Sequence, residues 1–275
     1  MTTEPATPAA APALTPTVLR DVVFAEPVGF RPLSLDLWRP ATTGVPVVVF
    51  LHGGGWRVGS RRTMTPTMPG DGPFARIAAA GLAVASIDYR LSGEACFPAQ
   101  VDDVAAALAW LRENGDEHGL DASRIVLWGE SAGATLAALV ALSRDDARAG
   151  VRGVVDWYGP SDLAVLAEDQ GGLDDPDLRE AGWLGHAVGA DLDRAHAASP
   201  VFQVVSGAPP FHIAHGTVDG AVPASQSVAL AQALLGAGAE AELTLVPGAG
   251  HLWQGDVDRD AILDAAIAFS RRVTS

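Results

Sequence analysis

Short runs of apolar residues recur along the chain, each bounded by glycine, proline or polar residues. Such runs are typical of strands buried in a sheet. The pattern predicts two antiparallel opening strands at 18–24 and 33–38. It predicts further buried strands at 45–51, 82–87, 125–128, 151–157, 211–215 and 240–246.

Helical periodicity lies between these runs. After Pro98, apolar residues recur at spacings of three, four and seven, at Val101, Val104, Ala105, Leu108 and Leu111. Strands that alternate with helices favour a mostly parallel sheet that is covered on both faces. The sequence therefore predicts an α/β fold with a central sheet of about eight strands flanked by helices.

The segment Gly129-Glu130-Ser131-Ala132-Gly133 lies between a predicted strand and a run of small residues typical of a helix. A serine hydroxyl becomes a nucleophile only when a base takes its proton, so it must stand on a sharp turn that base and substrate can both reach. Glycines two residues to either side permit that turn. Because composition alone gives this pattern a chance expectation of ~0.16, its place after a strand is what indicates a nucleophile.

The segment His52-Gly53-Gly54-Gly55-Trp56 is far more specific, with a chance expectation of ~0.0002 in this chain. Consecutive glycines after a buried strand let the backbone approach a ligand and offer N–H groups as donors. We expect an oxyanion hole formed by Gly54, Gly55 and Ala132, with Gly53 as an alternative because the sequence does not fix the turn. The competing interpretations are a flexible loop or a phosphate-binding loop, although the Lys and Ser/Thr of a P-loop are missing.

At these two motifs the chain resembles the α/β-hydrolase family, specifically the carboxylesterases and lipases of the hormone-sensitive-lipase type and compact bacterial esterases. Further segments similar to family landmarks extend the likeness to about residues 20–273. They are Asp88-Tyr89-Arg90-Leu91, His215-Gly216-Thr217-Val218-Asp219-Gly220-Ala221-Val222-Pro223 and Pro247-Gly248-Ala249-Gly250-His251. The resemblance implies the α/β-hydrolase fold with a small helical cap insertion, and a triad in the chain order Ser, Asp, His.

That order assigns Ser131 as the nucleophile, Asp219 as the acid and His251 as the base. Taken alone, an Asp after an apolar run commonly serves a turn or a helix N-cap, and a His in a glycine-rich loop needs no catalytic role. Asp156, at the end of a predicted strand, is the rival acid, although its surroundings are more typical of the entry to the cap.

Length and charge limit the alternatives. The 275 residues fit one α/β-hydrolase domain, expected at 17–275 with the cap at 160–198, behind a disordered Ala/Pro/Thr-rich tail at 1–16. The net charge of −15 argues against a nucleic-acid partner. The tail lacks the features of a secretory signal and no apolar run reaches membrane-spanning length, so we expect a cytoplasmic protein. The oligomeric state stays open, a homodimer included.

Tryptophans in loops or at strand ends are candidates for the wall of a substrate pocket, since tryptophan offers broad apolar contact. They are Trp56, Trp157, Trp183 and Trp253. For Trp157 and Trp183, packing under the cap is an equal alternative.

The predicted cap carries nine acidic residues against two arginines. They indicate either a solvated surface or a negative rim that repels anionic substrates. His212 and His215 are three residues apart on a predicted strand and face opposite sides, so we expect no metal site, and no cofactor is predicted.

We expect a serine carboxylesterase that acts on small, uncharged esters with short or aromatic acyl groups through an acyl-enzyme. An amide hydrolase of the same fold, arylformamidase-like or a peptidase, is one alternative, because the triad does not distinguish C–O from C–N cleavage. A non-catalytic ligand-binding module is another. The presence of all three triad candidates argues against it.

Overall fold

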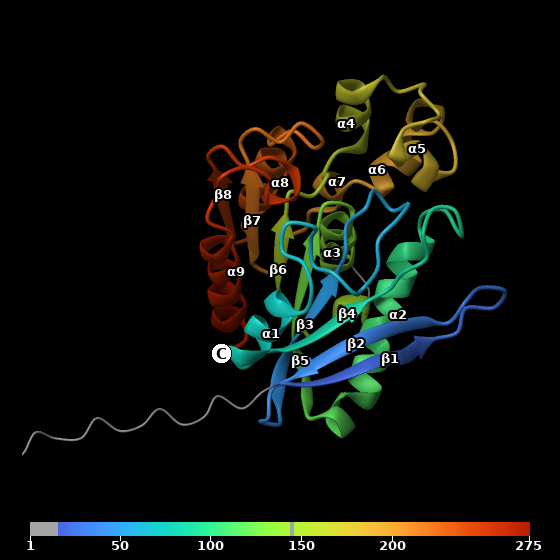
Figure 1. The fold of residues 1–275 in the computed structure, drawn as a ribbon. Helices are drawn as coiled ribbons and strands as arrows, with labels where there is room; N and C mark the ends of the chain where they lie inside the picture. Colours follow the sequence, from blue (N-terminus) through green and yellow to red (C-terminus); the bar gives the residue numbers. More distant parts are fainter. Residues whose placement is uncertain (1–15, 144–145) are drawn as a thin grey trace, which may run out of the picture.

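The computed structural model describes residues 16–143 and 146–275, so the tail expected at 1–16 lies outside the described residues except for Pro16. One eight-stranded sheet has the order β1-β2-β4-β3-β5-β6-β7-β8 (Figure 1). The first three strands in that order pair antiparallel, and all later pairs are parallel. The strands are β1 (Thr17–Ala25), β2 (Leu33–Arg39), β3 (Val45–Leu51), β4 (Ala83–Ile87), β5 (Leu120–Glu130), β6 (Val151–Trp157), β7 (Phe211–Gly216) and β8 (Ala241–Val246).

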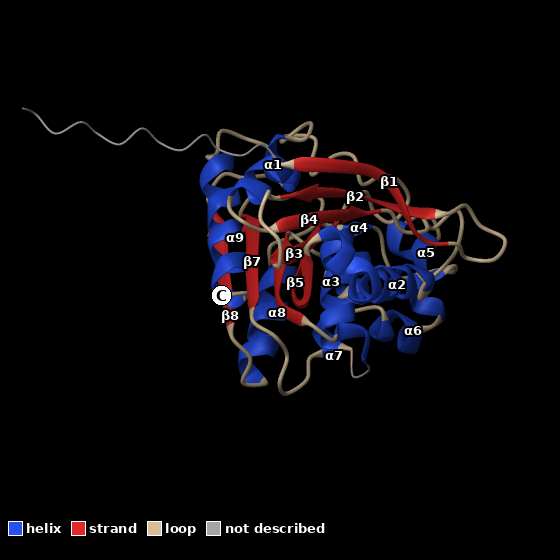
Figure 2. Ribbon diagram, turned by 90° about the horizontal axis from the view of Figure 1, so that it is seen from below, coloured by secondary structure: helices blue, strands red, loops and turns tan. Residues whose placement is uncertain are grey.

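Helices cover both faces of this sheet (Figure 2). One face carries α1 (Gly72–Ala79) and α9 (Arg259–Val273), and the other carries α2 (Ala99–Asn114), α3 (Ala132–Leu142) and α8 (Ser225–Gly236). Within the described ranges, no helix is both long and apolar enough to cross a bilayer.

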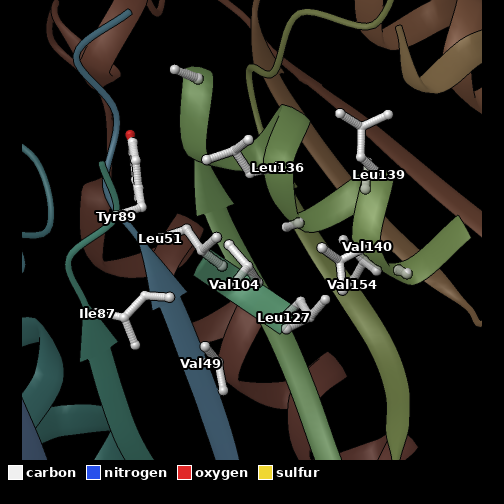
Figure 3. Close-up of a cluster of buried hydrophobic side chains, with 14 of the residues drawn as sticks. Val49, Leu51, Ile87, Tyr89, Val104, Leu127, Leu136, Leu139, Val140 and Val154 are labelled. Carbon is white, nitrogen blue, oxygen red and sulfur yellow. The ribbon is translucent and has the colours of Figure 1, made fainter. Parts of the chain in front are cut away.

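The central strands are apolar on both faces, as a doubly covered sheet requires. On β3, Phe50 packs edge-to-face against Phe74 of α1, whereas Val49 and Leu51 join the cluster on the opposite face. Figure 3 shows those two side chains in one group with Leu136 of α3. The helix that follows the candidate nucleophile is therefore held directly on the sheet.

The predicted strands agree with the structure to within two residues at their ends, except at the start of β5. That strand begins at Leu120, five residues before the predicted 125–128. Polar residues interrupt its first part, at Asp121, Ser123 and Arg124, and Asp121 Oδ1 accepts a hydrogen bond from Ser123 N at 3.0 Å in a local turn. The pairing with β3 is irregular at the same place, between Pro46 and Val47. Because Asp and Ser are typical of turns, the apolar pattern did not predict this first part of the strand.

Short helices fill the connection from β6 to β7, and we call residues 161–198 the helical insert. They lie at the end of the molecule where the arrows of the parallel strands point (Figure 1). The helices of this connection are α4 (Leu163–Gln170), α5 (Arg179–Leu184), the 3₁₀ turn Val188–Ala190, α6 (Leu192–Ala197) and α7 (Pro200–Gln203). The remaining 3₁₀ turns of the described residues are Gly115–His118, Asp146–Arg148 and His251–Trp253.

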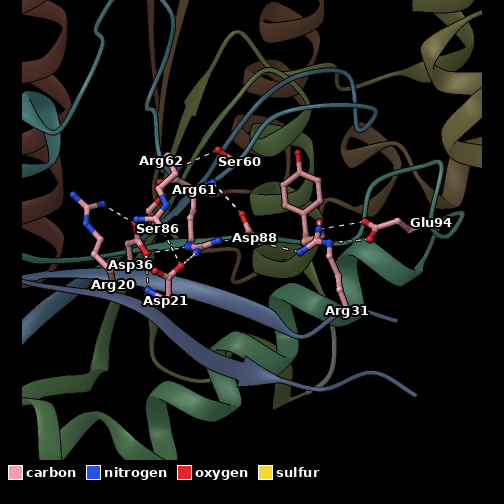
Figure 4. Close-up of polar contacts among 11 residues, drawn as sticks. Arg20, Asp21, Arg31, Asp36, Ser60, Arg61, Arg62, Ser86, Asp88 and Glu94 are labelled. Carbon is pink, nitrogen blue, oxygen red and sulfur yellow. Dashed lines mark hydrogen bonds and ion pairs between the residues drawn. The ribbon is translucent and has the colours of Figure 1, made fainter. Parts of the chain in front are cut away.

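A network of charged side chains fastens the loop after β3 to the antiparallel edge (Figure 4). Arg61 Nε donates to Asp36 Oδ1 at 2.9 Å, and the same guanidinium pairs with Asp88 and Asp21. Burial opposes ionisation of Asp36, but hydrogen bonds from Asp21 N–H, Arg20 and Arg61 outweigh it and lower the pKa of this carboxyl. These contacts hold the segment around Arg61, which follows the glycine-rich loop, against β1 and β2.

Candidate active site

Ser131 stands on a sharp turn between β5 and α3. Its backbone has φ 51° and ψ −123°, a strained conformation for a residue with a side chain, and its N–H donates to Trp157 O at 2.8 Å. A Cβ on Gly133 would lie 2.1 Å from the carbonyl oxygen of Leu51, and one on Gly129 would lie 2.3 Å from the carbonyl carbon of Gly133. Only glycine at both positions lets the strand and helix close around the serine.

Three predicted site residues form one chain of hydrogen bonds. Ser131 Oγ lies 3.1 Å from His251 Nε2, and His251 Nδ1 lies 2.7 Å from Asp219 Oδ2. They follow the carboxyl ends of β5, β8 and β7 respectively, which is the edge where open α/β sheets bind ligands. The structure brings together residues that are 32 and 120 positions apart.

The Asp219 carboxylate is fully buried and held on both oxygens. Its Oδ1 accepts hydrogen bonds from the N–H groups of Ala221 and Val222, at 2.8 and 2.9 Å. Burial opposes its ionisation, but the hydrogen bonds from His215 and His251 dominate and hold its pKa well below the ordinary value. It is therefore an ionised acceptor that fixes the ring of His251.

Asp156, the rival acid, lies elsewhere. It ends β6 and is buried, and its Oδ1 accepts from Gly159 N at 2.9 Å. Burial raises the pKa of this carboxyl to about 6. Among the described contacts it has no hydrogen bond to His251, so its role is to hold the turn after β6.

Three backbone N–H groups near Ser131 are candidate donors for an oxyanion. No described residue accepts a hydrogen bond from the N–H of Gly54, Gly55 or Ala132, and the two glycines line the same pocket as Ser131. The suggestion of Gly53 as an alternative donor is wrong, because its N–H donates to a buried carboxylate at 2.9 Å. The remaining three amides can stabilise an oxygen that gains negative charge.

That carboxylate belongs to Glu130, which the sequence analysis did not assign. Its other oxygen accepts from the hydroxyl of Tyr158 at 2.7 Å, and the tyrosine ring packs edge-to-face on His251 with centroids 4.9 Å apart. Burial raises the pKa of Glu130, while hydrogen bonds from Tyr158 and Gly53 partly oppose the rise. Glu130 therefore links the turn that carries Ser131, the glycine-rich loop and the ring of Tyr158 beside His251. The sequence offered one indication of this role, since Glu130 directly precedes Ser131.

A pocket of about 650 Å³ opens at Ser131. Its apolar lining residues include Val58, Val218 and Leu252, and its charged ones are Arg57 and Arg179. The remaining lining residues are Gly54, Gly55, Gly220, Ala221, Gly250, His251 and Gln254.

None of the four tryptophans proposed for the pocket wall lines this pocket, so that prediction is wrong. Trp56 is stacked on Trp183 with ring centroids 4.2 Å apart, and Trp157 packs edge-to-face against Trp253. All four are at most 1% exposed. Trp56 and Trp253 have positive φ values, 56° and 57°, and their side chains are buried although they follow strand ends. Position in a loop did not predict exposure.

The acidic residues of the helical insert do not line the pocket either. Most are exposed, as in the solvated-surface interpretation, and Glu180 is buried. His212 packs near Phe269 of α9, whereas His215 bonds to Ser227 of α8, so the two histidines face opposite sides of the sheet. In the described ranges no group of three His, Cys, Asp or Glu could hold a metal ion.

Comparison with known proteins supports the resemblance. Residues 35–234 match the family model described as BD-FAE. Esterase LipQ of Mycobacterium tuberculosis is 35% identical over 224 residues, which cover 77% of this chain and 52% of LipQ. Carboxylesterase NlhH of the same organism is 33% identical over 227 residues, covering 78% of this chain and 68% of NlhH. The chain spans about half the length of LipQ and of Esterase LipC, the latter covered to 56%.

Solved structures agree over nearly the whole chain. A truncated carbohydrate esterase from gut microbiota superposes with a TM-score of 0.82 at 27% identity, covering 96% of this chain and 98% of that one. A thermophilic esterase from Thermogutta terrifontis, solved with propionate bound, gives 0.72 at 26% identity and covers 96% of both chains.

The contacts of Glu130 predict a positioning role that ester turnover can measure. Glu130→Ala should lower kcat for 4-nitrophenyl acetate by roughly 10²-fold, because the glycine loop loses its anchor and the donors shift relative to Ser131. Glu130→Gln, which keeps an oxygen for Gly53 N–H, should restore most of the rate. Equal losses in both variants would contradict the positioning role of Glu130. Tyr158→Phe is the control, because it removes only the hydrogen bond from Tyr158 to Glu130 and leaves the one from Gly53.

Proposed function

Since the chain belongs to the α/β-hydrolase esterase family, we propose that it hydrolyses carboxylic esters with Ser131 as the nucleophile. The observation that carries this proposal is the hydrogen-bond chain from Ser131 Oγ through His251 to Asp219, set beside unoccupied backbone donors. Acyl transfer requires a nucleophile, a base with a fixed ring, and donors for the oxyanion.

The reaction follows from these positions. His251 Nε2 accepts the proton of Ser131 as the hydroxyl oxygen attacks the ester carbonyl, and later returns it to the leaving alcohol. Asp219 keeps the proton of His251 on Nδ1, which leaves Nε2 as the acceptor. Water, activated by the same imidazole, then attacks the acyl-enzyme and releases the acid.

The negative charge on the carbonyl oxygen develops near the N–H groups of Gly54, Gly55 and Ala132. Each such donor contributes about 10²- to 10³-fold to turnover, because it is already oriented before the charge forms. The strained turn at Ser131 supports the same role, since a sharp strand-to-helix turn exposes the serine hydroxyl and offers the N–H of the next residue, here Ala132, as an oxyanion donor.

The pocket supports short acyl groups, because Val58, Val218 and Leu252 offer a limited apolar surface. The tryptophans that favoured an aromatic acyl group are packed in the core and give it no support. The preference for uncharged esters expected from the sequence is a prediction that nothing tests. The two arginines in the pocket do not support it, because they would attract an anionic substrate. Relatives named esterase and carboxylesterase support ester rather than amide cleavage.

A paired substrate panel tests the proposed function. The protein should hydrolyse 4-nitrophenyl acetate and butyrate far faster than the matching 4-nitroanilides, as release of nitrophenol and nitroaniline will show. Comparable or faster cleavage of the anilides would favour the amide hydrolase. No turnover of any member would favour a ligand-binding module.

Substitution of the two candidate acids tests the proton path. Asp219→Asn should lower kcat by about 10⁴-fold, because the amide favours the wrong tautomer of His251. Asp156→Asn should leave kcat within about tenfold of the parent, since the described hydrogen bonds of Asp156 include none to Ser131, His251 or Asp219. Steady-state kinetics with 4-nitrophenyl acetate on variants of unchanged circular dichroism measure both. The opposite ranking would move the acid to Asp156.

A further inference from the structure

The charged lining of the active-site pocket has one sign. Arg57 and Arg179 line it together with Ser131 and His251, and no Asp or Glu is among its described lining residues. The chain as a whole carries a net charge of −15. The pocket therefore carries positive charge, whereas the protein as a whole and the helical insert around Arg179 are acidic.

Arg179 is placed against the oxyanion loop with its charged group unpaired. Its Cδ would lie 2.4 Å from a Cβ built on Gly55, so its aliphatic part runs directly over the loop that carries the amide donors. Within the described ranges, no residue forms an ion pair with its guanidinium or accepts a hydrogen bond from it. An arginine offers five donors in a planar fork that matches a carboxylate.

Arg57 strengthens the positive wall. Its Nη2 donates to the carbonyl oxygens of Asp177 and Leu178 at 2.9 and 3.1 Å, which ties the glycine loop to the segment just before α5. Glu180 is the acid that interacts electrostatically with both arginines, yet it is buried and outside the pocket lining. Among the described residues Glu180 forms no ion pair with either arginine, so the guanidinium of Arg179, unlike that of Arg57, keeps its donors for a ligand.

We propose that Arg179, with Arg57 beside it, binds a carboxylate of the substrate, so that the preferred esters are anionic. The inference rests on the proposed function, since it concerns the substrate of the same serine. The fitting compounds carry a carboxylate a few atoms from the scissile carbonyl, either on the acyl side, as in dicarboxylic half-esters, or on the alcohol side, as in acylated hydroxy acids. The acidic insert does not oppose them, because its carboxylates lie outside the pocket.

Two isosteric substrate pairs test the proposal. They also distinguish a carboxylate on the acyl side of the ester from one on the alcohol side. Monoethyl succinate and ethyl succinamate differ only in a carboxylate or carboxamide on the acyl side. Acetoxyacetate and 2-acetoxyacetamide differ in the same way on the alcohol side. In at least one pair, kcat/KM from pH-stat titration should be about tenfold or more higher for the anion, the size expected of a charge-assisted hydrogen bond.

Arg179→Gln should reduce that ratio of kcat/KM values to about twofold or less, because the anionic ester loses a charged partner and slows more than its neutral counterpart. Arg179→Lys should keep part of the preference, and added salt should reduce it in the parent protein. Arg271→Gln, at an exposed position of α9 that does not line the pocket, removes the same charge and should change neither rate.

Several results would overturn the inference. If the parent protein cleaves both carboxamide-bearing esters as fast as, or faster than, their anionic counterparts, the inference is wrong and no variant is needed. Equal loss on both members of a pair in Arg179→Gln would indicate a structural role for Arg179. Hydrolysis of 4-nitrophenyl acetate reports the proposed function separately: if it proceeds while the anionic preference is missing, only the inference fails, and if it is absent, both fail.

Discussion

The close approach of the α3 N-terminus to the end of β3 is the constraint on which the site depends. Gly133 lies against the carbonyl oxygen of Leu51 with no room for a Cβ, and that carbonyl belongs to the last residue before the glycine loop. The nucleophile and two of the amide donors come from different strands, and this contact brings them to one edge. A methyl group at Gly133 would push them apart and separate the hydroxyl from the donors.

The buried polar groups around this contact hold the geometry. Glu130 joins the glycine loop to Tyr158, and Asp219 joins the turn after β7 to His251. Each carboxylate is satisfied on both oxygens, which keeps it from becoming an unpaired buried charge. The environments differ in effect. Hydrogen bonds keep Asp219 ionised against burial, whereas burial prevails at Glu130 and raises its pKa.

Much of the fold and the three-residue chain of the site could be predicted from the sequence, because strand-end motifs and glycine spacing reflect local backbone requirements. The assignment of Asp219 as the acid and His251 as the base followed from the resemblance to the α/β-hydrolase family, whose members carry the triad in the order Ser, Asp, His. What failed depended on side-chain direction. Trp56 and Trp253 sit in loops but turn inward at positive φ, and the Gly53 amide is taken by a carboxylate next to the serine. Neither fact is encoded by spacing.

The pocket charges were equally beyond sequence reasoning. Arg57 lies beside the glycine motif and Arg179 within an acidic segment, and only the folded chain brings both into the lining of one pocket. Composition emphasised the acids of the insert, which point elsewhere. Net charge describes the surface as a whole, whereas a substrate meets the few groups that line the pocket.

The central claim is that Ser131 is activated by its surroundings, and covalent labelling tests it most directly. Intact-mass and peptide mass spectrometry after treatment with a neutral serine-directed phosphonate should show one adduct per chain, located on Ser131, and none in Ser131→Ala. An adduct on another residue, or a folded protein that stays unmodified under conditions that label a known serine esterase, would contradict the account.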